Sequence, residues 1–400
     1  MRDPSGITPL YYTLTDGKVS FASQASWLGL LANGAPRDLN KLEIEAHRQW
    51  ESLGYVSGQQ TLLAGVREVA PGAVMQFDLT GKLLNEASIG LPARGLKEAS
   101  TPSDSVRNSI QQATARNLNA DIEPYLLFSG GLDSTLLLHC MVNEGVRPRL
   151  IALQYSGGEN DAELSHALRV ARYYGCELEM TQFKRLDSRE LQDLFLNRVD
   201  WPLDGGSLLP KVALADYLRD RDCTVVMGGS GADELFGGYQ RHQARLAMST
   251  EGVLGSLDAE LNYYRSWIGK FGDSEGAFDR FLEARSNDAY ADPAFVYDLL
   301  ELSQFHNPRL DSCFANVGLE YRPVFQDQDI VALAASMTLS EKSELGNPKK
   351  ILRDAFRREM KPEFIDVPKS PLRFAEMGPF PAWRQSIFNA WSSARSMASA

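Results

Sequence analysis

The residues whose types and spacing point most directly to chemistry are those at 129–135, which read SGGLDST. They follow an apolar run and open a helical pattern, so they stand at a strand–helix junction. Gly130 and Gly131 let the backbone turn sharply and approach a charged group, and a helix amino terminus offers free N–H groups to an anion. Ser129 and Ser134 add hydroxyl donors. The loop therefore predicts a phosphate-binding site.

Asp133 is the unusual member of this loop, because a carboxylate beside phosphates is repulsive. A divalent cation between the two removes the conflict, so Asp133 predicts Mg²⁺. The plainer alternative is a glycine turn with a Ser or Asp cap at the start of a helix. The full seven-residue pattern at a strand–helix junction favours the phosphate site. It is not a Walker loop of the GxxxxGKS/T form, and the chain contains no such loop.

The composition is that of an ordinary globular protein. Of 400 residues, 44% are apolar and 23% are charged, which excludes a disordered chain, a collagen and a coiled-coil rod. The formal net charge of −11 argues against non-specific binding to DNA, RNA or an anionic membrane, although it leaves room for a local basic pocket. We find no signal peptide and no apolar run of membrane-spanning length, so we expect a cytoplasmic protein.

The four cysteines predict neither a zinc site nor a disulfide framework. Cys140, Cys176, Cys223 and Cys313 are far apart, with no CxxC pair and no Cys/His cluster.

Hydrophobic patterning divides the chain into a β-rich first part and an α/β second part. The first part contains two hairpin signals, with Asp-Gly and Thr-Gly turns at 16–17 and 80–81, and a helical spacing at 39–50. In the second part, strands without polar alternation are separated by helices, which is typical of a parallel sheet covered on both faces. The predicted strands are 125–128, 150–155, 177–183 and 223–227, and the predicted helices are 105–118, 134–144, 161–174 and 208–218. Beyond residue 236 the pattern is mostly helical, to about 388.

Five ordered blocks of this sequence resemble the asparagine synthetase family. The SGGLDST loop looks like the pyrophosphate-binding loop of the ATP pyrophosphatase fold, and GADELFGGY at 231–239 resembles the family's second signature. GLEYR at 318–322 with Phe325 and Asp327 resembles a third block, and Lys349 followed by ILR a fourth. Lys369 lies where the family keeps a lysine near its C-terminus, and segments at 2–12, 54–56 and 71–72 look like the later half of the family's glutaminase domain.

The resemblance implies a fold and a set of domains. We expect an α/β parallel sheet of the ATP pyrophosphatase (adenine nucleotide alpha hydrolase-like) type, with a mostly helical C-terminal part and a small β-rich N-terminal remnant. The expected boundaries are a truncated glutaminase-like domain at 1–95, a linker at 96–105, a synthetase domain at 106–390 and a flexible tail at 391–400.

The resemblance also implies an acyl-adenylate mechanism and assigns roles to residues. A carboxylate attacks the α-phosphorus of ATP, pyrophosphate leaves, and ammonia or an amine attacks the activated acyl group. Asp133 and Asp233 become Mg²⁺ ligands at the carboxyl ends of two parallel strands, although Asp233 alternatively caps the helix after Gly231. Lys349 would pair with phosphate oxygens, and Lys369 would stabilise the pyrophosphate or the acyl transition state. A lone lysine is otherwise a solvated surface group.

The remaining predicted residues bind the nucleotide. Leu127 and Leu153 are candidates for the walls of an adenine pocket and are equally plausible as plain core residues, whereas Arg322 and Asp327 are expected to form a structural pair. The nucleotide-binding set is Leu127, Ser129, Gly130, Gly131, Asp133, Ser134, Leu153, Gly229 and Ser230.

Two departures from the family pattern bear on the reaction. Asparagine synthetases carry a glutamate where this chain has Ser230, and a serine does not accept a proton as a carboxylate does near neutral pH. β-Lactam synthetases have a tyrosine there, so the position varies with the nucleophile. The chain also has no cysteine before Cys140, whereas the family's glutaminase begins with a catalytic one. We therefore expect no glutamine hydrolysis, and either a fragment of a longer product or a member that uses free ammonia or an amine.

Two classes of function are consistent with these residues. The first is an ATP- and Mg²⁺-dependent, AMP-forming amide ligase, either making asparagine from aspartate or acting as a specialised cyclase, as in β-lactam or lasso-peptide synthesis. The second is a non-catalytic regulator that binds a nucleotide, which the intact Asp133, Asp233, Lys349 and Lys369 disfavour. The expected partners are a small-molecule or peptide carboxylate with ammonia or an amine, and neither nucleic acid nor membrane. The sequence leaves open whether the chain forms a homo-oligomer.

Overall fold

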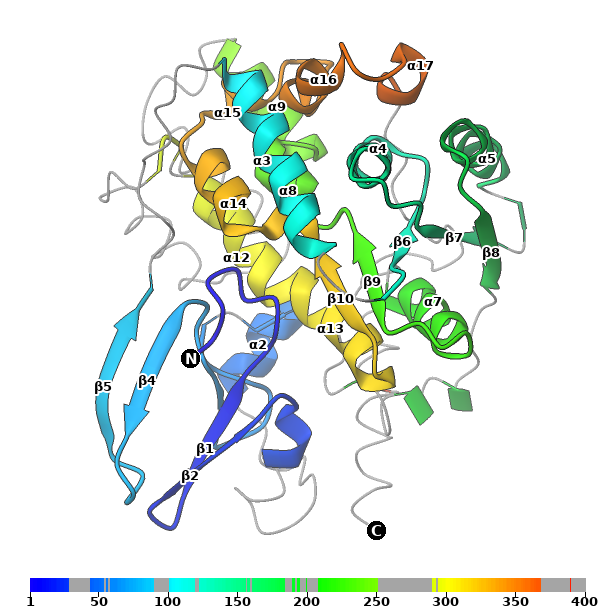
Figure 1. The fold of residues 1–400 in the computed structure, drawn as a ribbon. Helices are drawn as coiled ribbons and strands as arrows, with labels where there is room; N and C mark the ends of the chain where they lie inside the picture. The colour runs from blue at the N-terminus through cyan, green and yellow to red at the C-terminus, as the bar shows by residue number, and fades with distance from the viewer. Residues whose placement is uncertain are drawn as a thin grey trace.

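The centre of the molecule is a five-stranded parallel sheet (Figure 1). All four neighbouring pairs in the order β10-β9-β6-β7-β8 run parallel, which confirms the predicted α/β class. The strands are β6 (Tyr125–Leu127), β7 (Arg149–Tyr155), β8 (Leu178–Phe183), β9 (Val225–Gly228) and β10 (Glu320–Pro323). The computed structural model describes residues 1–28, 44–53, 55–56, 58–89, 101–118, 122–155, 157–158, 160–183, 189–190, 193–194, 199, 208–250, 290–292, 294–367 and 389.

Helices cover both faces of this sheet, as continuous apolar strands require. Along β6, Leu126 contributes to one core cluster and Tyr125 to the other, so successive side chains enter opposite cores. The first core contains residues of α3 (Pro102–Asn117), α4 (Leu132–Asn143) and α5 (Asp161–Tyr174). The second contains residues of α7 (Leu208–Arg219) and α13 (Asn307–Phe314). Figure 1 shows α4 and α5 above the sheet and α7 and α13 below it.

Local sequence sets the bounds of several helices. Thr101 caps α3 by accepting a hydrogen bond from the Asp104 amide, and Pro102 occupies its first turn. Gly175, with φ +66°, ends α5 in the left-handed conformation. Further helices are α8 (Ala232–Phe236), α9 (Gln240–Thr250), α12 (Phe295–Glu301), α14 (Gln328–Ala335), α15 (Leu339–Lys342), α16 (Lys350–Phe356) and α17 (Pro362–Ile365), with the 3₁₀ turns η3 (Ala315–Val317) and η4 (Val324–Gln326).

One strand of the sheet was not predicted. β10 lies within a region expected to be helical, and it adds to the sheet edge beside β9. It is only four residues long, and polar Glu320 and Arg322 alternate along it, so it lacks the apolar run that marks the other strands.

The prediction that Arg322 and Asp327 form a pair is wrong. Arg322 instead binds Glu320, and Asp327 binds Arg116.

The N-terminal residues form small antiparallel sheets. β1 (Tyr11–Thr15) pairs with β2 (Lys18–Ala22) and β3 (Val66–Glu68), and β4 (Ala73–Phe77) pairs with β5 (Leu83–Ser88). Asp16 and Gly17 both have positive φ, at +50° and +70°, which is the geometry of a tight hairpin turn. Both predicted hairpins are confirmed. The helix predicted at 39–50 is present as α2 (Ile44–Leu53), while residues 39–43 lie outside the described part.

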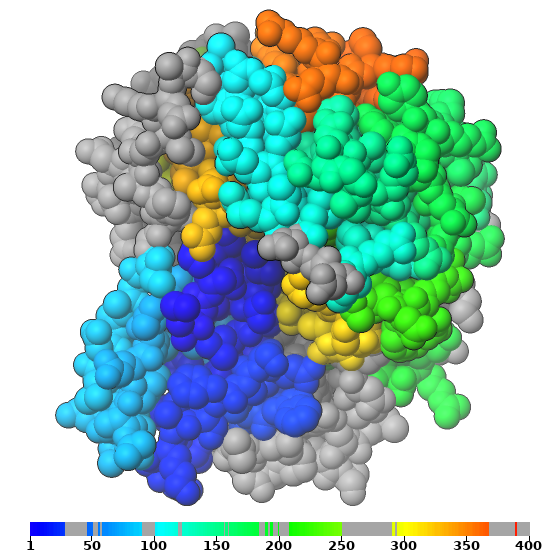
Figure 2. All heavy atoms as spheres, viewed as in Figure 1, coloured from blue at the N-terminus to red at the C-terminus, as the bar shows by residue number. Residues whose placement is uncertain are grey.

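A shared core joins the N-terminal residues to the larger part. Tyr11 and Trp50 belong to the same apolar cluster as Leu310 and Phe314 of α13. In the space-filling view the blue N-terminal residues lie against the yellow residues of the α13 region (Figure 2). The predicted linker 96–105 and tail 391–400 fall largely outside the described residues, so the domain boundaries stay predictions.

Arg2 ties the N-terminus to both parts of the molecule. Its side chain is buried and forms a 2.6 Å ion pair with Glu68, and it also donates to the Val69 carbonyl at 2.8 Å. It reaches the Ser303 carbonyl at 3.4 Å as well. Ser303 belongs to η2 (Leu302–His306), a π-helix that joins α12 to α13. Among the described helices, none is long and apolar enough to cross a membrane.

Replacing Arg2 with Met should destabilise the chain in a pH-dependent way. Burial raises the pKa of Glu68 and Arg2 opposes that shift, so without Arg2 the folded state holds a buried, unpaired carboxylate at neutral pH. We expect a loss of about 3–5 kcal/mol in the free energy of unfolding at neutral pH. A raised carboxyl pKa favours the folded state at low pH, so the loss should shrink as the pH falls through the folded pKa of Glu68.

Urea unfolding of the two proteins at several pH values measures this difference. Arg67→Met is the matched control, because Arg67 is the exposed neighbour of Glu68 on β3. An equal loss for both variants, or one independent of pH, would contradict the assignment of Arg2 as the counter-ion of Glu68.

Candidate functional site

The sheet reverses its strand order between β6 and β9. From β6 the chain continues to β7 on one side, and it later returns to place β9 on the other. Ligands of open α/β sheets bind at such a switch point, outside the carboxyl ends of the strands. The loops after β6 and β9 approach each other there, because a Cβ on Gly229 would lie only 3.0 Å from the Cβ of Asp133.

The loop after β6 is a tight glycine turn that leads into α4. Gly130 has φ +74°, and a Cβ there would lie 2.8 Å from the Cα of Ala167, so a side chain has no space. Gly131 is the N-cap of α4 and no side chain caps this helix end. The Ser129 hydroxyl accepts from the Gly131 amide at 3.2 Å and lies 3.4 Å from the Ser134 hydroxyl. The alternative of an ordinary Ser or Asp cap is therefore not what the structure has.

Asp133 and Asp233 hold one lysine between them. The Lys349 ammonium donates to both carboxylate oxygens of Asp133, at 2.6 and 2.8 Å, and lies 2.7 Å from Oδ1 of Asp233. The lysine side chain is 6% exposed, whereas the aspartates are 23% and 22% exposed. Asp233 occupies the first turn of α8 without capping it. The structure thus brings three of the predicted residues together at one point of the sheet edge.

The backbone fixes Lys349 at this point. It has φ +57°, in the left-handed region that a non-glycine residue rarely adopts, and it precedes α16. Its amide donates to the Ser343 hydroxyl at 2.8 Å, and that hydroxyl donates to the Phe236 carbonyl at 2.9 Å. The end of α8 therefore positions the start of α16. Strain of this kind persists only where the surroundings require it.

Gly238 leaves room for the lysine–aspartate contact. A Cβ at this position would overlap Oδ1 of Asp233 and Cε of Lys349. Its amide donates to the Asp233 carbonyl at 2.8 Å, so this part of the signature stays close to the backbone of α8.

The two aspartates stabilise the charged form of Lys349. Burial disfavours the Lys349 ammonium, but the Asp133 and Asp233 carboxylates outweigh burial and raise the pKa of Lys349. Arg353, one turn further along α16, is also buried, and burial lowers its pKa although Asp366 and Asp133 act in the opposite direction. Two cationic side chains, Lys349 and Arg353, therefore lie close to the carboxylate of Asp133.

A hydroxyl pair joins the loop after β9 to β10, and the sequence analysis assigned no role to Tyr321. Tyr321 donates from its phenol to the Ser230 hydroxyl at 2.9 Å. Its ring stacks on Phe314 with centroids 5.2 Å apart, and a Cβ on Gly228 would overlap the phenol. Burial raises the pKa of Tyr321 to about 12, so the phenol stays protonated near neutral pH. No local signal could have found this contact between residues far apart in the chain.

A buried carboxyl group lies beside this pair. Glu234 accepts a 2.6 Å hydrogen bond from the Tyr239 phenol, and His306 Nε2 lies 3.2 Å from the same oxygen. Burial and the neighbouring Asp233 raise the pKa of Glu234 to about 7. His306 reaches this position from the π-helix η2, so the helix that contacts the N-terminal residues also contacts α8.

Other predicted residues lie elsewhere or outside the described part. Leu127 and Leu153 pack in the core on the α7 side of the sheet, which agrees with the plain core alternative and leaves the adenine assignment a prediction. Lys369 lies in the stretch 368–388, outside the described residues.

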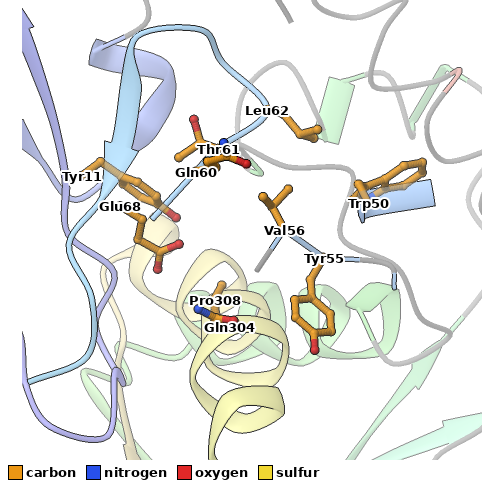
Figure 3. Close-up of a pocket in the computed structure, with 10 residues that line it drawn as sticks. All are labelled: Tyr11, Trp50, Tyr55, Val56, Gln60, Thr61, Leu62, Glu68, Gln304 and Pro308. Atoms are coloured by element: carbon orange, nitrogen blue, oxygen red, sulfur yellow. The ribbon is translucent and has the colours of Figure 1, made fainter. Parts of the chain in front are cut away.

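Two cavities adjoin the N-terminal residues, and neither is lined by Asp133, Asp233 or Lys349. One, of about 210 Å³, lies between residues 7–8, α13 and β10. The other encloses only about 30 Å³ between the N-terminal residues and the η2–α13 region. Figure 3 shows its lining, which is Tyr11, Trp50, Tyr55, Val56, Gln60, Thr61, Leu62, Glu68, Gln304 and Pro308.

A family model and the curated relatives of this chain point to the same family. The family model described as Asparagine synthase matches residues 105–396. The chain is 29% identical to the glutamine-hydrolyzing asparagine synthetase 1 of Bacillus subtilis, over 62% of this chain and 38% of the relative. It is 24% identical to the glutamine-hydrolyzing asparagine synthetase 2 of the same organism, over 94% of this chain and 54% of the relative. The chain thus spans about half or less of the length of these relatives.

A solved structure with similarity to the chain is the NH3-dependent NAD synthetase from Campylobacter jejuni. It matches with a TM-score of 0.25 and 19% identity, over 51% of this chain and 94% of that one.

Replacing Gly238 with Ala should break the contact between Lys349 and Asp233. The new methyl group would overlap Oδ1 of Asp233 and Cε of Lys349. The chain must therefore either separate this ion pair or shift α8. We expect a loss of about 1–3 kcal/mol in the free energy of unfolding, measured by urea denaturation. Gly145→Ala is the control, because a Cβ there meets nothing within 4 Å and only its φ of +81° opposes the change. A Gly238→Ala variant as stable as wild type would show that the Lys349–Asp233 contact does not need the space at Gly238.

Proposed function

This chain belongs to the asparagine synthase family, and on that premise we propose that it is an ATP-dependent amide ligase that releases AMP and pyrophosphate. The observation that carries the proposal is the meeting of Asp133, Asp233 and Lys349 at the switch point of the sheet. The same two carboxylates would also serve a protein that only binds a metal–nucleotide complex, so release of pyrophosphate is what separates the two functions.

The proposed reaction has two steps. A carboxylate oxygen of the acyl substrate bonds to the α-phosphorus of ATP, while the bond from that phosphorus to the bridging oxygen breaks and pyrophosphate leaves. The nitrogen of ammonia or an amine then bonds to the acyl carbon, the bond to AMP breaks, and the nitrogen loses a proton. Both steps develop negative charge on oxygen, so fixed donors and cations lower their barriers.

The residues of the loop would bind the phosphates. Backbone amides at the start of α4, with the Ser129 and Ser134 hydroxyls, would contact phosphate oxygens. Gly130 and Gly229 allow close packing here, because a Cβ there would lie 2.8 Å from the Cα of Ala167 and 3.0 Å from the Cβ of Asp133. Gly131 would bring its backbone close to a ligand. Lys349 would move its ammonium onto the phosphates, and Lys369 is proposed to act on the same leaving group.

The donor set fits Mg²⁺. Asp133 and Asp233 are hard oxygen ligands that already share one cation, and Mg²⁺ typically takes one or two carboxylates together with phosphate oxygens and waters. When bound, the ion would neutralise charge on the phosphates as a Lewis acid. We propose Asp133 and Asp233 as the residues that hold it.

A specialised amine nucleophile is a second candidate within the same reaction. It is favoured by Ser230, which stands where asparagine synthetases carry a glutamate and which accepts a hydrogen bond from the Tyr321 phenol. Neither group is a base near neutral pH, since the pKa of Tyr321 is raised to about 12. Asparagine synthesis from aspartate and closure of an internal amide are therefore the two variants to compare.

ATP–pyrophosphate exchange tests the proposal. We expect exchange with at least one acid from a panel of amino acids and peptides, beginning with aspartate, in the presence of Mg²⁺. Exchange with none of them, under conditions where the folded protein binds ATP, would favour the nucleotide-binding regulator.

Asp133→Asn should abolish this exchange without unfolding the chain. The amide keeps the size of the side chain but loses the charge that binds a cation, so we expect exchange to fall roughly a hundredfold or more. Asp354→Asn is the control, because Asp354 pairs with Lys350 within α16 and not with Lys349. Full exchange by Asp133→Asn would remove Asp133 from the metal site.

A further inference from the structure

We propose that Lys349 occupies the position of the divalent cation until a nucleotide draws it away, so that the metal enters only together with the nucleotide. This inference rests on the proposed function, because it concerns the same two aspartates. It makes Lys349 a positioning residue that sets the order of binding, in addition to its proposed contact with phosphate.

The geometry of the ammonium carries the inference. Its nitrogen is within 2.8 Å of three oxygens that belong to two different carboxylates. A divalent ion held by Asp133 and Asp233 would use these oxygens, and it would place two positive charges beside the one already there. Because like charges at such short range repel strongly, the ammonium and the ion exclude each other.

The protein alone offers too few ligands to displace the lysine. Over the described part of the chain, no group of three or more His, Cys, Asp or Glu side chains could hold a metal ion. Mg²⁺ prefers six oxygen ligands, so a site of two carboxylates needs phosphate oxygens and water to complete it. Those phosphate oxygens are also the anions that would attract the ammonium away from the aspartates.

The proposed exchange moves only the tip of Lys349, because its backbone is fixed. The Lys349 amide is held by Ser343, which is itself bonded to the end of α8. The ammonium is at the end of a four-carbon stem with rotatable bonds, and Gly238 presents no side chain to Cε of this stem. Rotation about these bonds would exchange the partners of the ammonium while Asp133 and Asp233 stay in place.

Titration of Mn²⁺ by electron paramagnetic resonance tests the inference on the folded 400-residue chain. Mn²⁺ takes the same hard oxygen ligands as Mg²⁺. For wild type, we expect weak binding of Mn²⁺ alone and at least roughly tenfold tighter binding with α,β-methylene ATP, which cannot release pyrophosphate. For Lys349→Met, we expect Mn²⁺ alone to bind at least roughly tenfold more tightly than to wild type.

Two further variants identify the site. Lys350→Met should behave as wild type, because Lys350 is the adjacent lysine and pairs with Asp354 instead. Adding Asp133→Asn to Lys349→Met should remove the gained Mn²⁺ site. A Lys349→Met protein that binds Mn²⁺ alone no better than wild type would overturn the inference.

The wild-type arm remains decisive if Lys349→Met does not fold. Tight stoichiometric binding of Mn²⁺ to wild type without nucleotide, lost in Asp133→Asn, would also overturn the inference. Failure of the ligase proposal is separate, since it appears as the absence of pyrophosphate exchange with every acid tested while these metal affinities still behave as expected.

Discussion

The candidate site depends on one electrostatic arrangement, in which a buried ammonium is balanced by two carboxylates. The buried lysine requires a counter-charge, and the two partly exposed carboxylates supply it. The three residues come from α4, α8 and the turn before α16, so the arrangement also joins the two halves of the parallel sheet. The left-handed backbone of Lys349 and the missing side chain of Gly238 are both consequences of it.

Much of this fold was accessible from the sequence because its signals are local. The Asp-Gly hairpin, the continuous apolar strands and the helix at Asp161–Tyr174 are each encoded within a few consecutive residues. Parallel strands also end at a common edge, which predicted that Asp133 and Asp233 lie near each other. The strand β10 escaped prediction because it is short and its stability comes from pairing with β9, which is distant in sequence.

The contacts within the site were less accessible because they are tertiary. Lys349 was predicted to contact phosphate, but nothing in its neighbours indicates that it bridges two aspartates 116 to 216 residues earlier. Tyr321 and Ser230 likewise meet only because β9 and β10 are adjacent. Side-chain pairing between strands depends on sheet order, and a sequence pattern does not contain the sheet order.

The π-helix η2 has a consequence for the tolerance of this chain to length changes. A π turn contains one residue more than an α turn, so losing one residue from Leu302–His306 would rotate α13 by about 100° relative to α12. Before this turn, Asp298 meets His242 of α9; after it, Asn307 holds Gln326 and the carbonyl of Ser5. The contacts of Asp298 and those of Asn307 can form together only when the extra residue is present. A single deletion here would therefore turn α13 away from its partners or α12 away from α9.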